Sequence, residues 1–156
     1  MAAAAHIASL NVSSPAFKDK DAIPARYTCQ GQNVNPPLAI KDIPEGAKSL
    51  VLIIEDPDAP GATFDHWVVW NIRPVGLIEE NTAPGVQGAN STGKNAYMGP
   101  CPPSGSHRYF FKIYALDSML DLPPGSDKKA VEKAMKDHIL GEGKLLGLYE
   151  KKPAEP

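Results

Sequence analysis

Two aspartates stand in a turn that should hold them with little freedom. Asp56 and Asp58 alternate with prolines in residues 56–60, directly after an apolar run at 49–55. Carboxylates fixed by prolines at the end of a strand suit a binding or catalytic site. An Asx turn, in which each side chain bonds its own backbone, explains the same pattern equally well.

Two histidines stand at the starts of the neighbouring apolar runs. His66 opens the run 66–72, and His107 immediately precedes the run 108–116. A histidine in such a place is often only a half-buried polar cap. An imidazole can also donate to an anionic oxygen, and a nearby carboxylate then fixes which ring nitrogen bears the proton. Three strands can bring both histidines and both aspartates to one rim of a sheet, which indicates a shared polar site.

A loop rich in glycine and proline, residues 98–107, precedes the last of these runs. Its fixed backbone would form a preorganised wall beside the site. Cys101 in this loop could be a nucleophile with His66 or His107 as its base. The prolines argue against an activating helix N-terminus, so a buried inert thiol fits Cys101 better. A zinc site from these three residues and Asp56 is chemically feasible, but the spacing matches no familiar pattern.

Residues 88–95 nearly spell a nucleotide phosphate loop. Asn95 stands where that motif needs a magnesium-binding hydroxyl, and no apolar strand precedes the segment. Prolines at 100, 102 and 103 exclude a long helix after it. A plain turn is therefore the better interpretation.

Composition limits the class of protein. The chain has 156 residues, with 16 Lys+Arg against 18 Asp+Glu, and this balance argues against a nucleic-acid binder. The length predicts one domain over 1–156, with a core at about 6–149 and a polar tail at 150–156. No apolar run is long enough to cross a membrane, and no secretory signal is evident, which predicts a cytoplasmic protein.

The elements that must position these side chains are mostly strands. Short apolar runs rich in β-branched and aromatic residues predict strands at 6–12, 49–55, 66–72 and 108–116. No helical pattern separates them, so antiparallel pairing is favoured. Residues 81–105 are expected to form a long irregular loop. The sequence thus predicts a mainly β fold.

One helix is expected near the C-terminus. Ser126 can cap it, and Gly141 supplies a stop. Its apolar stripe at i, i+3 and i+4 spacing contains Ala130, Val131, Ala134, Met135, His138 and Ile139. A last apolar segment follows at 145–149.

Together these motifs resemble the phosphatidylethanolamine-binding protein family, which includes the Raf kinase inhibitor protein and the plant flowering regulators. The motifs are 56–60, 66–72 and 99–109, with supporting matches at 23–29, 35–38 and 114–117. The likeness covers residues 14–149 and is closest to the short bacterial and archaeal branch. It implies antiparallel sheets packed face to face, a large one against a smaller one, with a helix near the C-terminus.

The resemblance also implies a cleft at the rim that binds phosphate-like, acetate-like or phosphoethanolamine groups without an enzymatic reaction, a metal or a cofactor. Asp56 and His66 would form one side of this cleft, with Asp58 as a carboxylate that orients an imidazole or meets an ammonium. Pro60 would shape the floor, Phe64 would be the aromatic residue, and the wall would contain Gly99, Pro102 and Pro103. His107 and Tyr109 would donate hydrogen bonds, and Tyr149 would lie near the opening. Asp65 replaces a further histidine of the animal members, which leaves the lipid-headgroup preference open.

The partners that the resemblance implies are a small anion and, as for some relatives, a kinase or a serine protease that the chain would inhibit. Contact with lipid is expected at the headgroup at most, and a homodimer is the expected assembly. The alternative function is a cysteine hydrolase that uses Cys101 with His107 or His66. A Cys101→Ala substitution separates the two, because only a hydrolase would lose its turnover.

Overall fold

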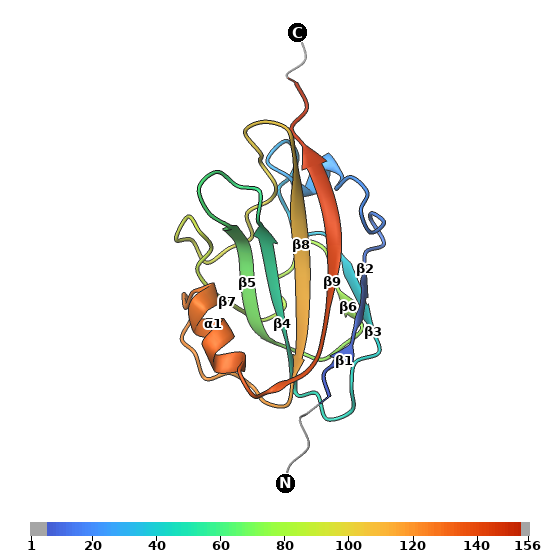
Figure 1. Cartoon of the computed structure of the whole chain (residues 1–156), viewed down its shortest axis with the longest axis vertical. Coiled ribbons are helices and arrows are strands. Elements are labelled where there is room, and N and C mark those ends of the chain that lie inside the picture. The colour runs from blue at the N-terminus through green and yellow to red at the C-terminus, as the bar shows by residue number, and fades with distance from the viewer. Residues whose placement is uncertain (1–5, 154–156) are drawn as a thin grey trace.

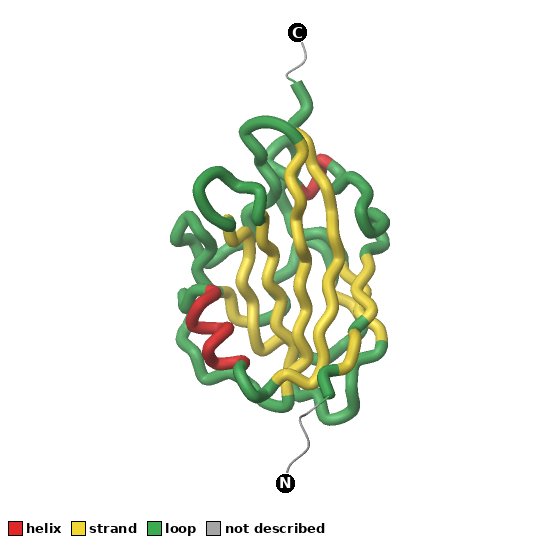
Figure 2. Tube along the Cα trace, in the orientation of Figure 1, coloured by secondary structure: helices red, strands yellow, loops and turns green. Residues whose placement is uncertain are grey.

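The structure is a computed structural model that describes residues 6–153, and it contains two β-sheets and one short α-helix (Figures 1 and 2). The six-stranded sheet has the order β1-β9-β8-β4-β5-β7, and the three-stranded sheet has the order β2-β3-β6. The larger sheet comprises β1 (Ala8–Ser9), β4 (Ser49–Asp56), β5 (Phe64–Ile72), β7 (Val86–Gln87), β8 (Ser106–Leu116) and β9 (Ile139–Glu150). The smaller comprises β2 (Asn11–Ser13), β3 (Leu38–Lys41) and β6 (Leu77–Ile78). The mainly β prediction is confirmed.

Three long strands form the middle of the large sheet. β4 pairs antiparallel with β5 on one side and with β8 on the other. Each extends one to two residues beyond its predicted range, because Asp56, Phe64 and His107 all continue the ladder rather than ending it. The polar residues at this rim are therefore held by strand backbone.

The two faces of the large sheet are covered differently. Leu50, Leu52 and Ile54 of β4 meet Leu38 and Ile40 of the small sheet in the main core. The alternate residues of β4 point to the opposite face, as the two-residue period of a strand requires. There they pack in a second cluster together with the helix α1 (Lys128–Met135).

The predicted C-terminal helix is present, but it is shorter than its apolar stripe indicated. Its N-cap is Asp127, whose side chain accepts a hydrogen bond from Ala130 N, and not Ser126. The helix ends at Met135, so His138 lies outside it, and the longest strand, β9, begins at Ile139. The expected stop at Gly141 was wrong, because this glycine lies inside β9.

Glycines in β9 let other segments come close to the strand. A Cβ at Gly143 would lie 2.3 Å from the carbonyl oxygen of Leu10, and one at Gly147 would lie 2.5 Å from the Ile23 side chain. These contacts bring the N-terminal segment against the inner face of the sheet. Gly143 and Gly147 are thus close-packing positions in a strand.

The expected strand at 6–12 divides between the two sheets. β1 pairs parallel with β9, the one parallel strand pair among the described residues, while β2 pairs antiparallel with β3. The long loop at 81–105 is irregular apart from β7. The near phosphate loop in it is a turn, in which the Asn90 side chain accepts from Thr92 N. Within residues 6–153, no helix has the length and apolar character needed to span a membrane, and the cytoplasmic location stays a prediction.

Candidate functional site

A cavity of about 200 Å³ lies at the rim where β4 ends and β5 and β8 begin. Its apolar wall contains Ala59, Pro60, Phe64, Met98, Cys101, Pro102 and Pro103. Its polar groups are Asp56, His66, His107 and Tyr109. The structure therefore brings together most of the residues expected at the cleft, and it adds Ala59, Met98 and Cys101 to them.

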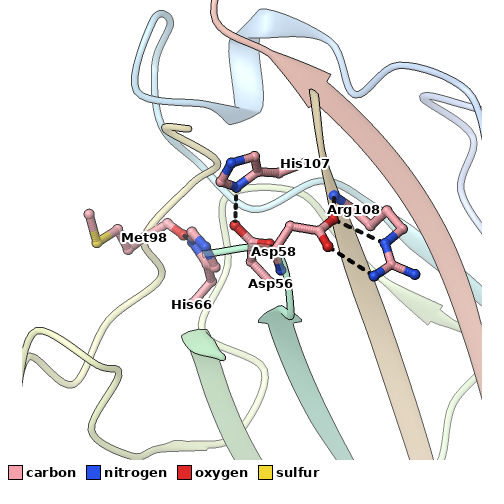
Figure 3. Close-up of polar contacts among 6 residues, drawn as sticks. All are labelled: Asp56, Asp58, His66, Met98, His107 and Arg108. Atoms are coloured by element: carbon pink, nitrogen blue, oxygen red, sulfur yellow. Dashed lines mark hydrogen bonds and ion pairs between the residues drawn. The ribbon is translucent and has the colours of Figure 1, made fainter. Parts of the chain in front are cut away.

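His107 and Asp56 form a buried pair at the base of the cavity (Figure 3). His107 Nδ1 lies 2.6 Å from Asp56 Oδ2. Because the carboxylate can only accept, Nδ1 bears the proton and Nε2 is left for a ligand. The other oxygen of Asp56 accepts from Asp58 N at 2.7 Å. The two interpretations of this aspartate, an Asx turn and a site residue, are both met in the structure.

His66 enters the cavity because β5 contains an extra residue at this point. Ile54 is opposite Trp67, whereas Glu55 is opposite Asp65, so His66 is the unpaired residue of a β-bulge. Bulges of this kind re-aim a side chain at the edge of a site. Nothing in the amino-acid pattern of residues 64–72 marks this extra residue.

The Met98 backbone fixes the orientation of the His66 ring. His66 Nδ1 donates to Met98 O at 2.6 Å, and Met98 N donates to His66 O at 3.0 Å (Figure 3). Burial lowers the pKa of His66, and the Met98 carbonyl and the charge of Asp56 counteract this only in part. The ring is therefore neutral at pH 7, with its Nε2 lone pair unused by hydrogen bonds within residues 6–153.

Tyr109 lies between the two imidazoles. Its ring stacks on His107 at a centroid distance of 6.4 Å and meets His66 edge-on at 5.2 Å. Its hydroxyl is buried and makes no hydrogen bond within the described part of the chain. Burial raises the pKa of Tyr109 and the Asp56 charge adds to this, while the Cys101 backbone amide acts weakly in the opposite direction. The hydroxyl is thus a protonated donor that lacks an acceptor.

The wall loop is held from behind by residues 25–33. Gly99 N donates to Asn33 Oδ1 at 2.8 Å, and a Cβ at Gly99 would lie 2.3 Å from Tyr27 O. Gly99 therefore supports the wall without lining the cavity. Asn33 has no feature in the sequence that marks it as part of the site.

Cys101 forms a disulfide with Cys29, 72 positions away in the chain. The expectation of an inert free thiol at Cys101 was therefore wrong. In this disulfide form the cysteine-hydrolase alternative lacks its nucleophile, which is a thiolate, because the sulfur is already bonded.

Two further residues expected at the cleft lie beside the cavity and do not line it. The carboxylate of Asp58 forks onto Arg108, accepting from Nε at 3.0 Å and from a terminal guanidinium nitrogen at 2.9 Å (Figure 3). These hydrogen bonds lower the pKa of Asp58 to about 2. Tyr149 is buried opposite His107 in the β8–β9 ladder and donates to Gln30 Oε1. Both residues support the rim from outside.

The site offers the Tyr109 hydroxyl as a donor and two imidazole Nε2 atoms, which accept in a neutral ring and donate in an imidazolium. Two imidazoles and one phenol converge, and the single carboxylate among them is already engaged by His107. Within residues 6–153, no group of three histidine, cysteine, aspartate or glutamate side chains is placed to hold a metal ion. The arrangement suits a small ligand whose oxygens accept from Tyr109 and from a protonated imidazole, or that carries a proton of its own to donate to a neutral Nε2.

Comparison with known proteins agrees with the motifs. The family model of the phosphatidylethanolamine-binding proteins matches residues 13–150. The UPF0098 protein of Methanothermobacter thermautotrophicus is 51% identical over 150 residues, covering 91% of this chain and 99% of that protein. A phosphatidylethanolamine-binding protein homolog from Chlamydia trachomatis is 42% identical in its crystal structure, with a TM-score of 0.89 over 92% of this chain and 99% of that one. E. coli YbcL, described as a member of the mammalian family, has a TM-score of 0.84 at 29% identity, over 93% of this chain and 100% of that one. The chain therefore belongs to the phosphatidylethanolamine-binding protein family.

Proposed function

We propose that the chain binds a small oxyanion in the rim cavity and does not turn it over. Phosphate, a phosphomonoester such as phosphoethanolamine, and a carboxylate share the required chemistry. The observation that carries the proposal is the buried Tyr109 hydroxyl without a protein acceptor, placed between two imidazoles whose Nδ1 atoms are already satisfied. A ligand oxygen at this position would accept from Tyr109 and from the Nε2 of a protonated imidazole, while the hydroxyl of a monoprotonated phosphate could donate to a neutral Nε2.

The size and walls of the cavity support a ligand no larger than a headgroup. A volume of about 200 Å³ holds a phosphate or a phosphoethanolamine but not an acyl chain. Prolines and Phe64 give the cavity a largely apolar lining, and a lower local dielectric strengthens hydrogen bonds to a charged oxygen. The Asp56 carboxylate opposes an anion, and the positive charge of an imidazolium in the cavity would offset that repulsion. Affinity should accordingly rise toward low pH.

The lining residues also support binding without catalysis. They include no serine, no threonine and no free thiol, so the His107–Asp56 pair has no neighbouring nucleophile to activate. Inhibition of a kinase or a serine protease, headgroup contact with lipid and a homodimer stay predictions from the family resemblance. Each would use the loop surface around the cavity mouth or another face of the sheets.

A thermal-shift titration tests the proposal. O-phosphoethanolamine and inorganic phosphate should both stabilise the protein saturably, by about 2.7 kcal/mol at 100 times the dissociation constant. The stabilisation should be stronger at pH 6 than at pH 8, because an imidazolium donates with both nitrogens. His107→Ala should abolish it. His138→Ala is the matched control, since His138 is exposed and paired with Asp117 outside the cavity.

No stabilisation by either ligand at either pH would overturn the proposal. Equal loss in His107→Ala and His138→Ala would also count against it, because the effect would then not come from the cavity. Isothermal titration calorimetry on the same variants gives the stoichiometry, which should be one ligand per chain.

A further inference from the structure

We infer that the Cys29–Cys101 disulfide is a redox-modification site that sets the affinity of the cavity, with small thiols as its reactants. The inference rests on the anion binding proposed above. Cys101 lines the cavity, whereas its partner Cys29 is exposed to solvent. The disulfide therefore joins a residue that lines the cavity to a residue that is exposed to solvent.

The disulfide anchors the part of the wall that hydrogen bonds leave open. Before Cys101, two hydrogen bonds hold the wall. Gly99 N donates to Asn33 Oδ1, and Cys29 N donates to Pro100 O at 3.1 Å. After it, ladder pairing resumes at Ser106, opposite Glu150. Between these points, the two prolines at 102 and 103 have no N–H to donate. The sulfur link is the covalent anchor of this stretch beside the cavity.

Reduction would change the cavity in two ways. Loss of the anchor would let residues 101–105 move away from the site, which raises the entropy cost of ordering the wall around a ligand. The released Cys101 thiol would also stand among the lining residues, and its thiolate would repel an anion. Asp56, His66, His107 and Tyr109 are the other titratable groups that face it there.

The reaction is ordinary thiol–disulfide exchange. A small thiolate attacks the sulfur of Cys29, forms a mixed disulfide and releases Cys101 as its thiolate. A second small thiolate attacks the sulfur of the first small thiol in this mixed disulfide and releases Cys29. Two small thiols are thereby oxidised to one disulfide, and two cysteine thiols form in the protein. Small thiols keep cysteines reduced in the cytosol, whereas disulfides persist in oxidising compartments. The affinity of the cavity for its anion would therefore differ between these compartments.

The experiment compares phosphate affinity by calorimetry in the oxidised protein, the dithiothreitol-reduced protein and Cys29→Ser. Cys29→Ser removes the bond but leaves every lining residue in place. Reduction should weaken binding about tenfold, and Cys29→Ser should match the reduced protein and be insensitive to reductant. Reoxidation of the wild type should restore affinity, which gives the same answer if the variant does not fold.

Amide hydrogen exchange of residues 98–107 is measured in parallel, without ligand, and should speed up several-fold on reduction. If the oxidised protein does not bind phosphate, the proposed function fails, yet faster exchange of this segment would still support control of the wall by the disulfide. The inference is overturned if exchange is the same in both redox states, if affinity is unchanged by reduction, or if the folded protein resists dithiothreitol.

Discussion

Along β4, Leu50, Leu52 and Ile54 fill the space between the two sheets, and the next residue of the same face, Asp56, enters the cavity. β8 shows the same change, since Phe111 belongs to the interior and His107 to the rim. β4 and β8 thus each contribute to an apolar interior and to a polar site within one continuous strand, whereas β5 reaches the site through the bulge at His66.

The two regions are stabilised by different interactions. Interior side chains gain from close packing and from removal of apolar surface from water. Rim side chains such as Asp56 and His66 are nearly as buried, and only specific hydrogen-bond partners offset their loss of water. Substitutions in the interior should therefore lower stability and leave ligand affinity unchanged. Substitutions at the rim should lower ligand affinity as well as stability, or mainly ligand affinity.

The largest effect on stability is expected in the interior. Phe111→Ala removes a fully buried ring that packs on Phe17 at a centroid distance of 5.7 Å. The free energy of unfolding should fall by about 3–5 kcal/mol in urea titrations. Phosphate affinity, measured where the variant is folded, should stay within about twofold. A loss of affinity as large as that at the rim would break the separation between the two regions.

At the rim, Asp56→Ala should cost less stability and more binding. It leaves His107 Nδ1 and Asp58 N without their acceptor, which costs about 1–3 kcal/mol in the same titration. Phosphate affinity should fall more than tenfold by calorimetry, because the His107 ring is no longer oriented. Asp56→Asn keeps one oxygen acceptor and should fall between this variant and the wild type. An alanine variant with unchanged affinity would contradict the assignment.

Acid should weaken the rim before the interior. Burial lowers the pKa of His66 in the folded protein, so the unfolded chain binds more protons in the window just below the ordinary histidine value of about 6.5. Stability should thus fall as pH decreases from 7 through this window, by at most about 1.4 kcal/mol per pH unit for this one group. Unfolding measured from pH 7 to pH 5 should show a flatter profile in His66→Gln, whereas the exposed His138→Gln should keep the wild-type slope.

The smallest effect is expected at the edge of the rim. The Arg108 hydrogen bonds hold the pKa of Asp58 at about 2, below its ordinary 3.8. The stability that this pair contributes should be present above pH 4 and disappear as pH falls toward 2. Asp58→Asn should remove that acid dependence and leave phosphate affinity within about twofold, since Asp58 does not line the cavity. A large loss of phosphate affinity in this variant would mean that Asp58 contributes to ligand binding.

Strongly apolar segments made the middle of the fold predictable. The runs at 49–55, 66–72 and 108–116 are rich in β-branched and aromatic side chains, which favour strands, and the structure buries most of them in the sheet. β9 could not be predicted in this way. Its glycines interrupt the apolar pattern, and their role depends on the distant Leu10 and Ile23.

At the site, sequence motifs indicated which residues gather but not how they are fixed. The motifs at 56–60, 66–72 and 98–107 indicated the aspartates, the histidines and the wall. The bulge at His66 depends on the register with β4, and the Cys29–Cys101 bond depends on two loops meeting across the fold. Both are set by tertiary structure, so residue spacing carries no signal for them.

The pairing of β1 with β9 has a consequence for synthesis on the ribosome. β1, the first of the described strands, joins the sheet beside β9, the last of them, and Ile23 N likewise bonds Leu148 O. Until β9 emerges, β8 lacks its neighbour and exposes eleven residues of open strand edge. Until β9 has emerged, this open strand edge can pair with other chains, so the nascent chain is prone to aggregation at this stage.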